Sequence, residues 1–191
     1  MPDTTTRLPA DATPTAPALV LRPWGPADAA GLAALGGDEA LRRWTSFAVD
    51  DEPSAARWLW EQRQGWEQGN RFSFAVEEAD PSSGGLPAGH VVLKDVLPGA
   101  ATAEIGYWKV ARARGRGIAP RALHALSDWA FAAFARDGLT RLVLLHQAGN
   151  TASCRVAGKS RYALTAVLPA RPPARPLAGH LHVRHGSGRA G

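Results

Sequence analysis

A loop rich in arginine and glycine lies between an expected strand and an expected helix, and its residue types suit a bound phosphate. The strand covers 102–109, and the loop reads Arg-Ala-Arg-Gly-Arg-Gly over 112–117. The first amides of a helix have no intrahelical acceptor, and the helix dipole places partial positive charge there. Gly115 and Gly117 let the backbone approach a ligand closely. We therefore predict a pyrophosphate site, with positive charge added by Arg112, Arg114, Arg116 and Arg121.

The charges are spread unevenly along the chain. Residues 1–110 carry 9 Lys and Arg against 15 Asp and Glu, whereas residues 111–191 carry 13 against 2. A basic half favours a polyanion, which is either a nucleic acid or a nucleotide-like cofactor. No aromatic residues are interleaved with the basic ones in a recognised nucleic-acid module, so we favour the cofactor. The acidic half suits a cationic substrate, the alternative being that both halves are solvated surfaces.

Size and composition indicate one globular domain without a membrane segment. The chain has 191 residues, of which 45% are hydrophobic and 20% charged, which is ordinary for a single domain. The single cysteine, Cys154, excludes an internal disulfide and fits a reducing cytoplasm. No apolar run approaches the roughly 20 residues of a membrane helix, and residues 1–17 lack the pattern of a signal peptide.

Hydrophobic periodicity predicts an α+β domain on a mixed, mostly antiparallel sheet of about seven strands. We expect a disordered tail over 1–17, the domain over 18–185, and fraying over 186–191. The expected strands cover 19–23, 71–76, 89–97, 102–109, 140–145, 162–168 and 179–184. The expected helices begin near residues 26, 38, 53, 116 and 151.

Three motifs in order carry a resemblance to a known family. Ala-Glu-Ile-Gly-Tyr-Trp over 103–108 precedes the loop of 112–117, and Asn-x-x-Ser-x-x-Val-x-x-Lys follows over 150–159. Together they resemble the GCN5-related N-acetyltransferases (GNAT), in particular the branch with the ribosomal-protein N-terminal acetyltransferases. The resemblance covers 19–185 and implies a single GNAT-type domain, splayed between its fourth and fifth strands. It departs at Gly158, Arg161 and Tyr162, where an acid, a Gly and a Phe are usual.

The resemblance implies that acetyl-CoA binds along the strand and the loop. Amides from about Arg114 to Ala119 would hold the pyrophosphate, and the backbone over 108–110 would pair with the pantetheine arm as an added strand would. Asn150 would reach the arm from the other wall. The expected cofactor residues are Trp108, Val110, Arg112, Arg114, Gly115, Arg116, Gly117, Ile118, Ala119, Asn150 and Ser153.

Acetyl transfer to an amine needs a base, an oxyanion donor and a proton for the leaving thiolate. Glu104 is the candidate base, acting through water, since the resemblance places it beside the thioester. The alternatives are that it orients the substrate ammonium or is a paired strand carboxylate. A backbone amide near Val110 is the expected oxyanion donor. Ser153 is the candidate proton donor, the alternative being a hydrogen bond to backbone only.

The other reactive residues are expected to have lesser roles. Cys154 is expected to be a core residue, because direct transfer needs no nucleophile. His146 is a candidate second base, and a structural role is the alternative. His180, His182 and His185 alternate along the last strand, but no carboxylate or cysteine accompanies them in the sequence, so no metal is expected. The position where other branches carry a tyrosine acid is Ala157.

The acceptor is expected beside the first helices and the loop of 44–52. Candidate lining residues are Trp44, Phe47, Asp50, Asp51 and Trp66, which would supply aromatic walls and carboxylates for a cation. The alternative is that the tryptophans are core and the acids solvated. The acceptor is a protein N-terminus or a small amine, and we expect no nucleic-acid or membrane partner but allow a homodimer. A catalytically silent acyl-CoA-binding domain is the competing function.

Overall fold

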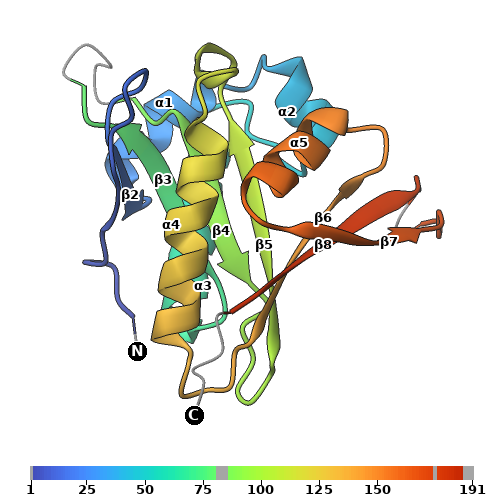
Figure 1. Ribbon diagram of the computed structural model, residues 1–191. Coiled ribbons are helices and arrows are strands. Elements are labelled where there is room, and N and C mark those ends of the chain that lie inside the picture. The colour runs from blue at the N-terminus through green and yellow to red at the C-terminus, as the bar shows by residue number, and fades with distance from the viewer. Residues whose placement is uncertain (1, 81–85, 174–175, 187–191) are drawn as a thin grey trace.

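The computed structural model describes residues 2–80, 86–173 and 176–186, built on one open sheet (Figure 1). In the described residues the sheet has eight strands in the order β1-β2-β3-β4-β5-β6-β8-β7. Every neighbouring pair is antiparallel except β5 and β6, which are parallel. The strands are β1 (Leu8–Ala10), β2 (Leu19–Pro23), β3 (Phe72–Glu78), β4 (Gly89–Lys94), β5 (Thr102–Lys109), β6 (Arg141–Gln147), β7 (Ala163–Leu168) and β8 (Gly179–His185).

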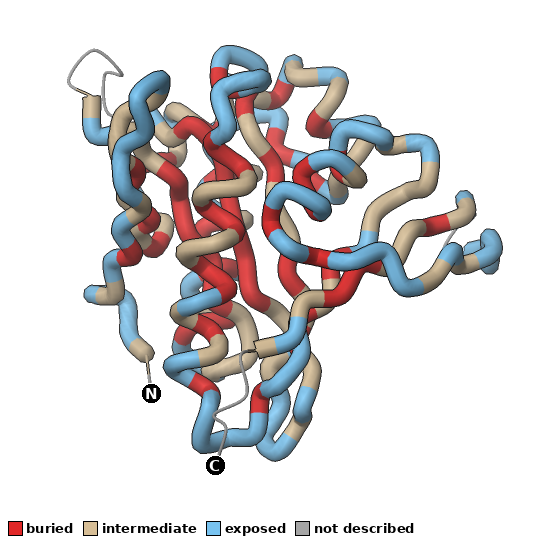
Figure 2. The backbone as a smooth tube through the Cα atoms, viewed as in Figure 1, coloured by how far each residue is buried: buried red, intermediate tan, exposed pale blue. Residues whose placement is uncertain are grey.

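Five α-helices flank this sheet in the described part of the chain. They are α1 (Ala29–Ala33), α2 (Glu39–Trp44), α3 (Glu52–Gln68), α4 (Ile118–Ala133) and α5 (Thr151–Lys159), with 3-10 turns η1 (Pro26–Asp28) and η3 (Ala111–Ala113). Helix α4 crosses the front of the sheet in Figure 1 and buries one face against β2, β4 and β5, as the red segments of Figure 2 show. The predicted α+β architecture with a mixed, mostly antiparallel sheet is therefore confirmed.

The eighth strand comes from the segment predicted to be a disordered tail. Strand β1 pairs with β2, and Leu8 is buried where it faces Leu21. The Arg121 guanidinium, from α4, also donates to the carbonyls of Asp11 and Pro17 at 2.6 and 2.7 Å. These contacts correct the prediction for 2–17. Of the tail expected to fray, residues 187–191 lie outside the described residues.

In the one parallel pair of the described sheet, the two strands are hydrogen-bonded along only about half of their length. Strands β5 and β6 are paired from Thr102 opposite Arg141 to Ile105 opposite Leu144, and the pairing stops there. Beyond that point β6 continues with β8, while β5 continues with β4. The predicted splay between the fourth and fifth strands of the domain is confirmed here. It leaves the β6-facing edge of β5, over 106–109, without a strand partner.

Helix α3 has clear start and stop signals. The Asp51 carboxylate accepts from the Ser54 amide at 2.8 Å, Pro53 occupies the first turn, and Gly69 ends the helix with φ of +69°. Asp51 is therefore the N-cap of α3, and it does not line the cavity described below. This corrects its predicted role.

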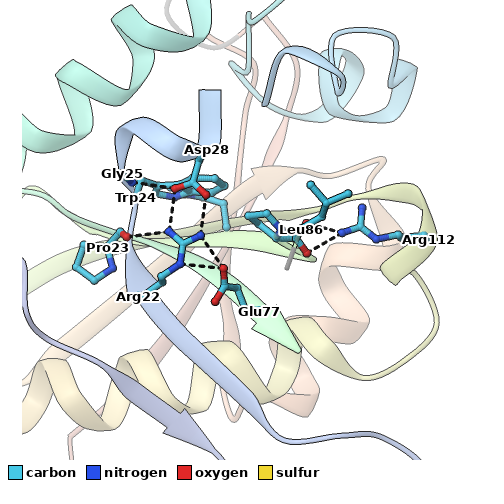
Figure 3. Close-up of polar contacts among 10 residues, drawn as sticks. Arg22, Pro23, Trp24, Gly25, Asp28, Glu77, Leu86 and Arg112 are labelled. Atoms are coloured by element: carbon cyan, nitrogen blue, oxygen red, sulfur yellow. Dashed lines mark hydrogen bonds and ion pairs between the residues drawn. The ribbon is translucent and has the colours of Figure 1, made fainter. Parts of the chain in front are cut away.

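A partly buried arginine fixes the end of β2 (Figure 3). The Arg22 guanidinium bridges the carboxylates of Asp28 and Glu77 at 2.6–2.8 Å. Asp28 is 7% exposed and also accepts from the Gly25 amide at 2.8 Å. Because charged groups out of water need full pairing, this network determines how η1 and α1 leave the sheet.

Candidate active site

A cavity of about 740 Å³ occupies the region where β5 and β6 separate. Its walls come from β4, β5, the end of β6, the start of α4, α5, and the segment of α2 with the loop after it. On β5, Glu104, Gly106 and Trp108 lie on one face and Tyr107 on the other, because side chains alternate along a strand. All four residues line the cavity, which therefore reaches both faces of the sheet.

The glycine loop forms one end of this cavity. Gly115 and Gly117 have φ of +80° and +70°, a backbone conformation that L side chains resist. In the described structure no hydrogen bond is recorded for the amides of 115–119, and Gly117, the N-cap of α4, supplies no side-chain cap. Gly115, Gly117, Ile118 and Ala119 line the cavity. This loop and the first turn of α4 therefore present backbone donors that suit an anion.

The arginines of this loop already have protein partners. Arg112 donates to the carbonyls of Leu86 and Pro87 at 2.8 and 2.9 Å (Figure 3), and Arg116 pairs with Glu78 at 2.6 Å. Neither lines the cavity. Arg114 does line it, and its guanidinium is 2.6 Å from the Asp38 carboxylate. These arginines, which the sequence analysis assigned to cofactor binding, instead form contacts between the loop and neighbouring parts of the protein.

Three other cations line the same end of the cavity. They are Lys109, Arg155 and Lys159, and no acidic partner is recorded for any of them within the described residues. Burial lowers the pKa of Lys109, with a further contribution from Arg114 and Arg155. Sequence reasoning missed these residues, and the basic surplus after residue 110 was the one signal that pointed to them.

The catalytic candidate Ser153 contacts a residue that sequence reasoning did not select. Its hydroxyl oxygen lies 3.0 Å from the Tyr107 hydroxyl oxygen, which joins α5 to β5 across the cavity. Burial raises the pKa of Tyr107. The Asn150 side chain caps α5 by accepting from the Ser153 amide at 3.1 Å. Tyr107, Asn150 and Ser153 all line the cavity.

Glu104 lines the cavity on the other face of β5. One of its carboxylate oxygens lies 2.7 Å from the Lys94 ammonium of β4, its recorded ion-pair partner within the described chain. The two residues are directly opposite each other in the antiparallel β4–β5 register. The carboxylate is thus a paired strand residue that remains in contact with the cavity.

Aromatic side chains form the wall beyond Glu104. Trp44, Phe47, Trp58, His90 and Trp108 line it, and the first two are candidate acceptor residues named from the sequence. His90 stacks on Trp108, with ring centroids 5.3 Å apart, and its Nδ1 accepts from Trp24 Nε1–H at 3.0 Å. Burial lowers the pKa of His90 to about 3, so the ring is neutral at pH 7. Neutral aromatic faces of this kind can hold a cation.

Several predicted site residues lie elsewhere. Trp66 is buried in the core against Phe72 and Phe74, and Asp50 pairs with Arg42. Neither lines the cavity, which corrects their predicted substrate role. Val110 does not line it either.

The Val110 amide already has an acceptor. It donates to the Ala88 carbonyl at 3.0 Å, so it is not available as the predicted oxyanion donor.

The expectation that no cysteine accompanies the last-strand histidines is also corrected. Cys154 Sγ lies 3.0 Å from His180 Nδ1 and 3.6 Å from His146 Nε2. His146 lines the cavity, but its Nε2 faces this cluster.

Comparison with known proteins gives one family. The family defined as the acetyltransferase (GNAT) domain matches residues 18–162. A putative ribosomal-protein-serine acetyltransferase from Vibrio cholerae is 21% identical, with a TM-score of 0.76, covering 97% of this chain and 100% of its own. Mycobacterium smegmatis RimJ, in complex with CoA-disulfide, is 23% identical, with a TM-score of 0.78, covering 95% and 86%.

A third solved structure shares the fold at lower identity. The microcin C7 self-immunity acetyltransferase MccE, in complex with acetyl-CoA and AMP, is 17% identical, with a TM-score of 0.75, covering 91% of this chain and 98% of its own. A search of curated protein sequences returned no match. Within the described residues, no helix combines the length and apolar character needed to cross a membrane.

Proposed function

Because this chain belongs to the acetyltransferase (GNAT) family, we propose that it transfers an acetyl group from acetyl-CoA to a primary amine. One observation carries the proposal. A single cavity joins the free amides at the start of α4 to the Glu104 carboxylate through the gap between β5 and β6. Anion binding at one end and a carboxylate at the other are what a phosphate-bearing acyl donor and an ammonium acceptor require.

The donor is proposed to lie along the splayed edge. Its pyrophosphate meets the amides of 115–119, and the cations Lys109, Arg155 and Lys159 neutralise the remaining phosphate charge. The pantetheine amides pair with the free edge of β5 over 106–109, because that edge has no strand partner. RimJ with CoA-disulfide and MccE with acetyl-CoA have the same fold, which supports acetyl-CoA as the donor.

Proton transfer is proposed to use both faces of β5. Glu104 binds the substrate ammonium and removes its proton through water, while Lys94 stabilises the charge of the carboxylate. The free amine attacks the thioester carbonyl and the C–S bond breaks. The attacking nitrogen loses its second proton to solvent, the CoA thiolate takes a proton from Ser153, and solvent replaces that proton through Tyr107. Tyr107 holds the Ser153 hydroxyl in place and can return a proton to it. The products are the N-acetylated amine and CoA.

The acceptor is proposed to enter along the aromatic wall. Trp44, Phe47 and Trp58 flank the approach to Glu104, which suits the cationic amine of a protein N-terminus or of a small molecule. RimL, whose structure is described as that of a ribosomal L7/L12 alpha-N-protein acetyltransferase, shares this fold, which supports a protein N-terminus as the first candidate. We place the reaction in the cytoplasm, which the single cysteine of the chain supports.

A panel of amines tests this function. Purified protein and acetyl-CoA are mixed with peptides bearing free N-termini, an amino sugar or a polyamine, and thiol release is followed. The matched controls are the same peptides with blocked N-termini. Turnover with a free amine and none with its blocked form is expected.

A catalytically silent acyl-CoA-binding domain is the competing function. The observation that favours it is the ion pair between Lys94 and Glu104, because a carboxylate already paired with a lysine is a weaker base. Acetyl-CoA binding by calorimetry without thiol release from any amine would replace the proposal with that function. No binding at all would contradict both.

A further inference from the structure

Four side chains with metal-ligating atoms meet beneath α5. They are His146 at the end of β6, Cys154 in the first half of α5, and His180 and His182 on β8, and their ligand atoms all lie within 4.8 Å of one another. His146 Nε2 is 3.1 Å from His182 Nε2, and Cys154 Sγ is 3.0 Å from His180 Nδ1. Neither Glu104 nor Tyr107 belongs to this cluster, so the proposed transfer reaction leaves it unexplained.

The strand register explains how the cluster forms. In the antiparallel pair β6–β8, His146 lies directly opposite His180. His182 is two residues further along β8, so its side chain points to the same face as that of His180. Helix α5 packs over this face (Figure 1) and brings Cys154 onto the histidines. Residues 2 to 36 positions apart in sequence thereby converge on one point.

The hydrogen bonds of two histidines determine which nitrogen faces inward. His146 Nδ1 is 2.8 Å from the Gln147 carbonyl, and His182 Nδ1 is 3.4 Å from the Tyr162 carbonyl. A carbonyl only accepts, so each Nδ1 carries the proton and each neutral ring leaves the Nε2 lone pair free. The two Nε2 atoms lie 3.1 Å apart, and in this tautomer both lone pairs are directed to the same point, where a cation could accept them. A histidine that binds a metal through one ring nitrogen usually donates the N–H of its other ring nitrogen to a carbonyl or a carboxylate.

We propose that His146, Cys154, His180 and His182 bind one zinc ion. Zinc takes thiolate and imidazole ligands in tetrahedral sets, at about 2.3 Å to sulfur and 2.0–2.1 Å to nitrogen. Such a set has edges of about 3.3 Å between nitrogens and about 3.6 Å from nitrogen to sulfur. The 3.1 Å contact between His146 Nε2 and His182 Nε2 and the 3.6 Å contact between Cys154 Sγ and His146 Nε2 are close to these edges. The contact between Cys154 Sγ and His180 Nδ1 is shorter, at 3.0 Å, and all four ligand atoms lie within 4.8 Å of one another. Three nitrogens and one thiolate exclude hard cations such as Mg²⁺ and Ca²⁺.

Four protein ligands fill the coordination sphere, so the ion is structural and does not contact substrate. On binding, the Cys154 thiol releases its proton and the thiolate becomes the fourth ligand. The ion connects α5 to β6 and β8. It thereby fixes the segment that presents Asn150 and Ser153 to the cavity.

Metal binding by the full chain tests the site without any activity assay. The protein is stripped with a chelator and titrated with Zn²⁺, and then separately with Co²⁺ as a spectroscopic probe. One equivalent of Zn²⁺ is expected to bind and to raise Tm. The Co²⁺ form is expected to show tetrahedral ligand-field bands and a thiolate-to-metal charge-transfer band.

Three variants decide the assignment. Cys154→Ser and His180→Ala remove half-buried ligands, while His185→Ala is the matched control, an exposed histidine on the same strand. The ligand variants are expected to lose more than about 100-fold in zinc affinity, beyond the 10–100-fold typical of losing an outer partner. Cys154→Ser also loses the charge-transfer band, and His185→Ala keeps both properties. No zinc binding by the wild type, or equal affinity in all the proteins, would overturn the proposal.

Discussion

The hydroxyl oxygens of Tyr107 and Ser153 lie 3.0 Å apart, and this contact links β5 to α5 across the gap in the sheet. Both side chains border the cavity where the thioester is proposed to lie. A chain of two hydroxyls can pass a proton toward a leaving thiolate. If the Ser153 hydroxyl bonded only to backbone, it would stabilise the start of α5 but would have no route for proton transfer.

Removing either hydroxyl is expected to lower the rate without weakening donor binding. Ser153→Ala loses the proton donor, so kcat falls by about 100-fold, at the low end for general acid catalysis. Tyr107→Phe loses the hydroxyl that positions Ser153 and returns its proton, a proton that solvent can also supply, so kcat falls by about tenfold and KM for acetyl-CoA is unchanged. Steady-state kinetics measure both. Full activity of Ser153→Ala, or a change confined to KM, would contradict these roles.

The glycine loop is expected to be sensitive to added side chains. A Cβ at Gly115 or Gly117 meets no atom within 4 Å, so Ala causes no clash, but both residues have positive φ. Left-handed backbone costs an L residue about 1–2 kcal/mol, so the loop shifts and its amides leave the phosphate. KM for acetyl-CoA is expected to rise by about tenfold with kcat nearly unchanged.

Gly158→Ala is the matched control for the loop variants. Gly158 lies in α5 with open space around its Cβ position and no positive φ. Its replacement is expected to stabilise the fold by about 0.5–1 kcal/mol and to leave KM as it is. If all three variants behave alike, the loop geometry does not determine donor affinity.

His90 is expected to make the fold sensitive to acid. Its pKa falls from 6.5 in the unfolded chain to about 3 in the folded protein because burial penalises the charged ring. Above pH 6.5 both states are neutral. As the pH falls from 6.5 toward 3, only the unfolded state binds the proton, so stability drops by up to about 1.4 kcal/mol per pH unit.

The variant His90→Asn keeps an acceptor for Trp24 but cannot titrate. Urea unfolding followed by tryptophan fluorescence is expected to show that the wild type loses about 2 kcal/mol more than His90→Asn between pH 6.5 and 4.5. Parallel stability curves for the two proteins would show that His90 is protonated in the folded state.

The Arg22 network is expected to contribute far more to stability than an exposed ion pair. Arg22→Met leaves the Asp28 carboxylate buried without its cation, so the free energy of unfolding falls by about 3 kcal/mol. Arg63→Met, which removes an exposed pair with Glu67, is expected to change it by less than about 0.5 kcal/mol. Urea titrations compare the two, and equal effects would contradict the assignment of the network.

The fold was predictable because its signals are local. Alternating apolar residues, Pro53 at the start of α3 and Gly69 at its end, and the glycines of the loop each act within a few residues. Strand β1 was missed because three residues in a Pro- and Thr-rich tail carry no periodicity. Its stability comes from the partner β2 and from Arg121, which is more than 100 residues away.

The candidate site was predictable only in part, because long-range contacts decide which residues face the cavity. Motif spacing located Glu104 and Ser153, but not the Lys94 ion pair, which needs the β4–β5 register. Trp66 and Phe47 are both aromatic residues in the first half of the chain, and their sequence context does not distinguish them. Only the packing of the folded chain shows that Phe47 lines the cavity and Trp66 does not. Cys154 and His180 are 26 positions apart, and the pairing of β6 with β8 brings them together.

The most direct test of acetyl transfer compares the wild type with Glu104→Gln in a thiol-release assay, using the best amine of the panel. Glu67→Gln on the exposed face of α3 is the matched control. We predict that Glu104→Gln lowers kcat by 10²–10⁴-fold, as expected for loss of a general base, while the control keeps the wild-type rate. Wild-type turnover by Glu104→Gln, or no thiol release by the wild type with any amine, would contradict the account.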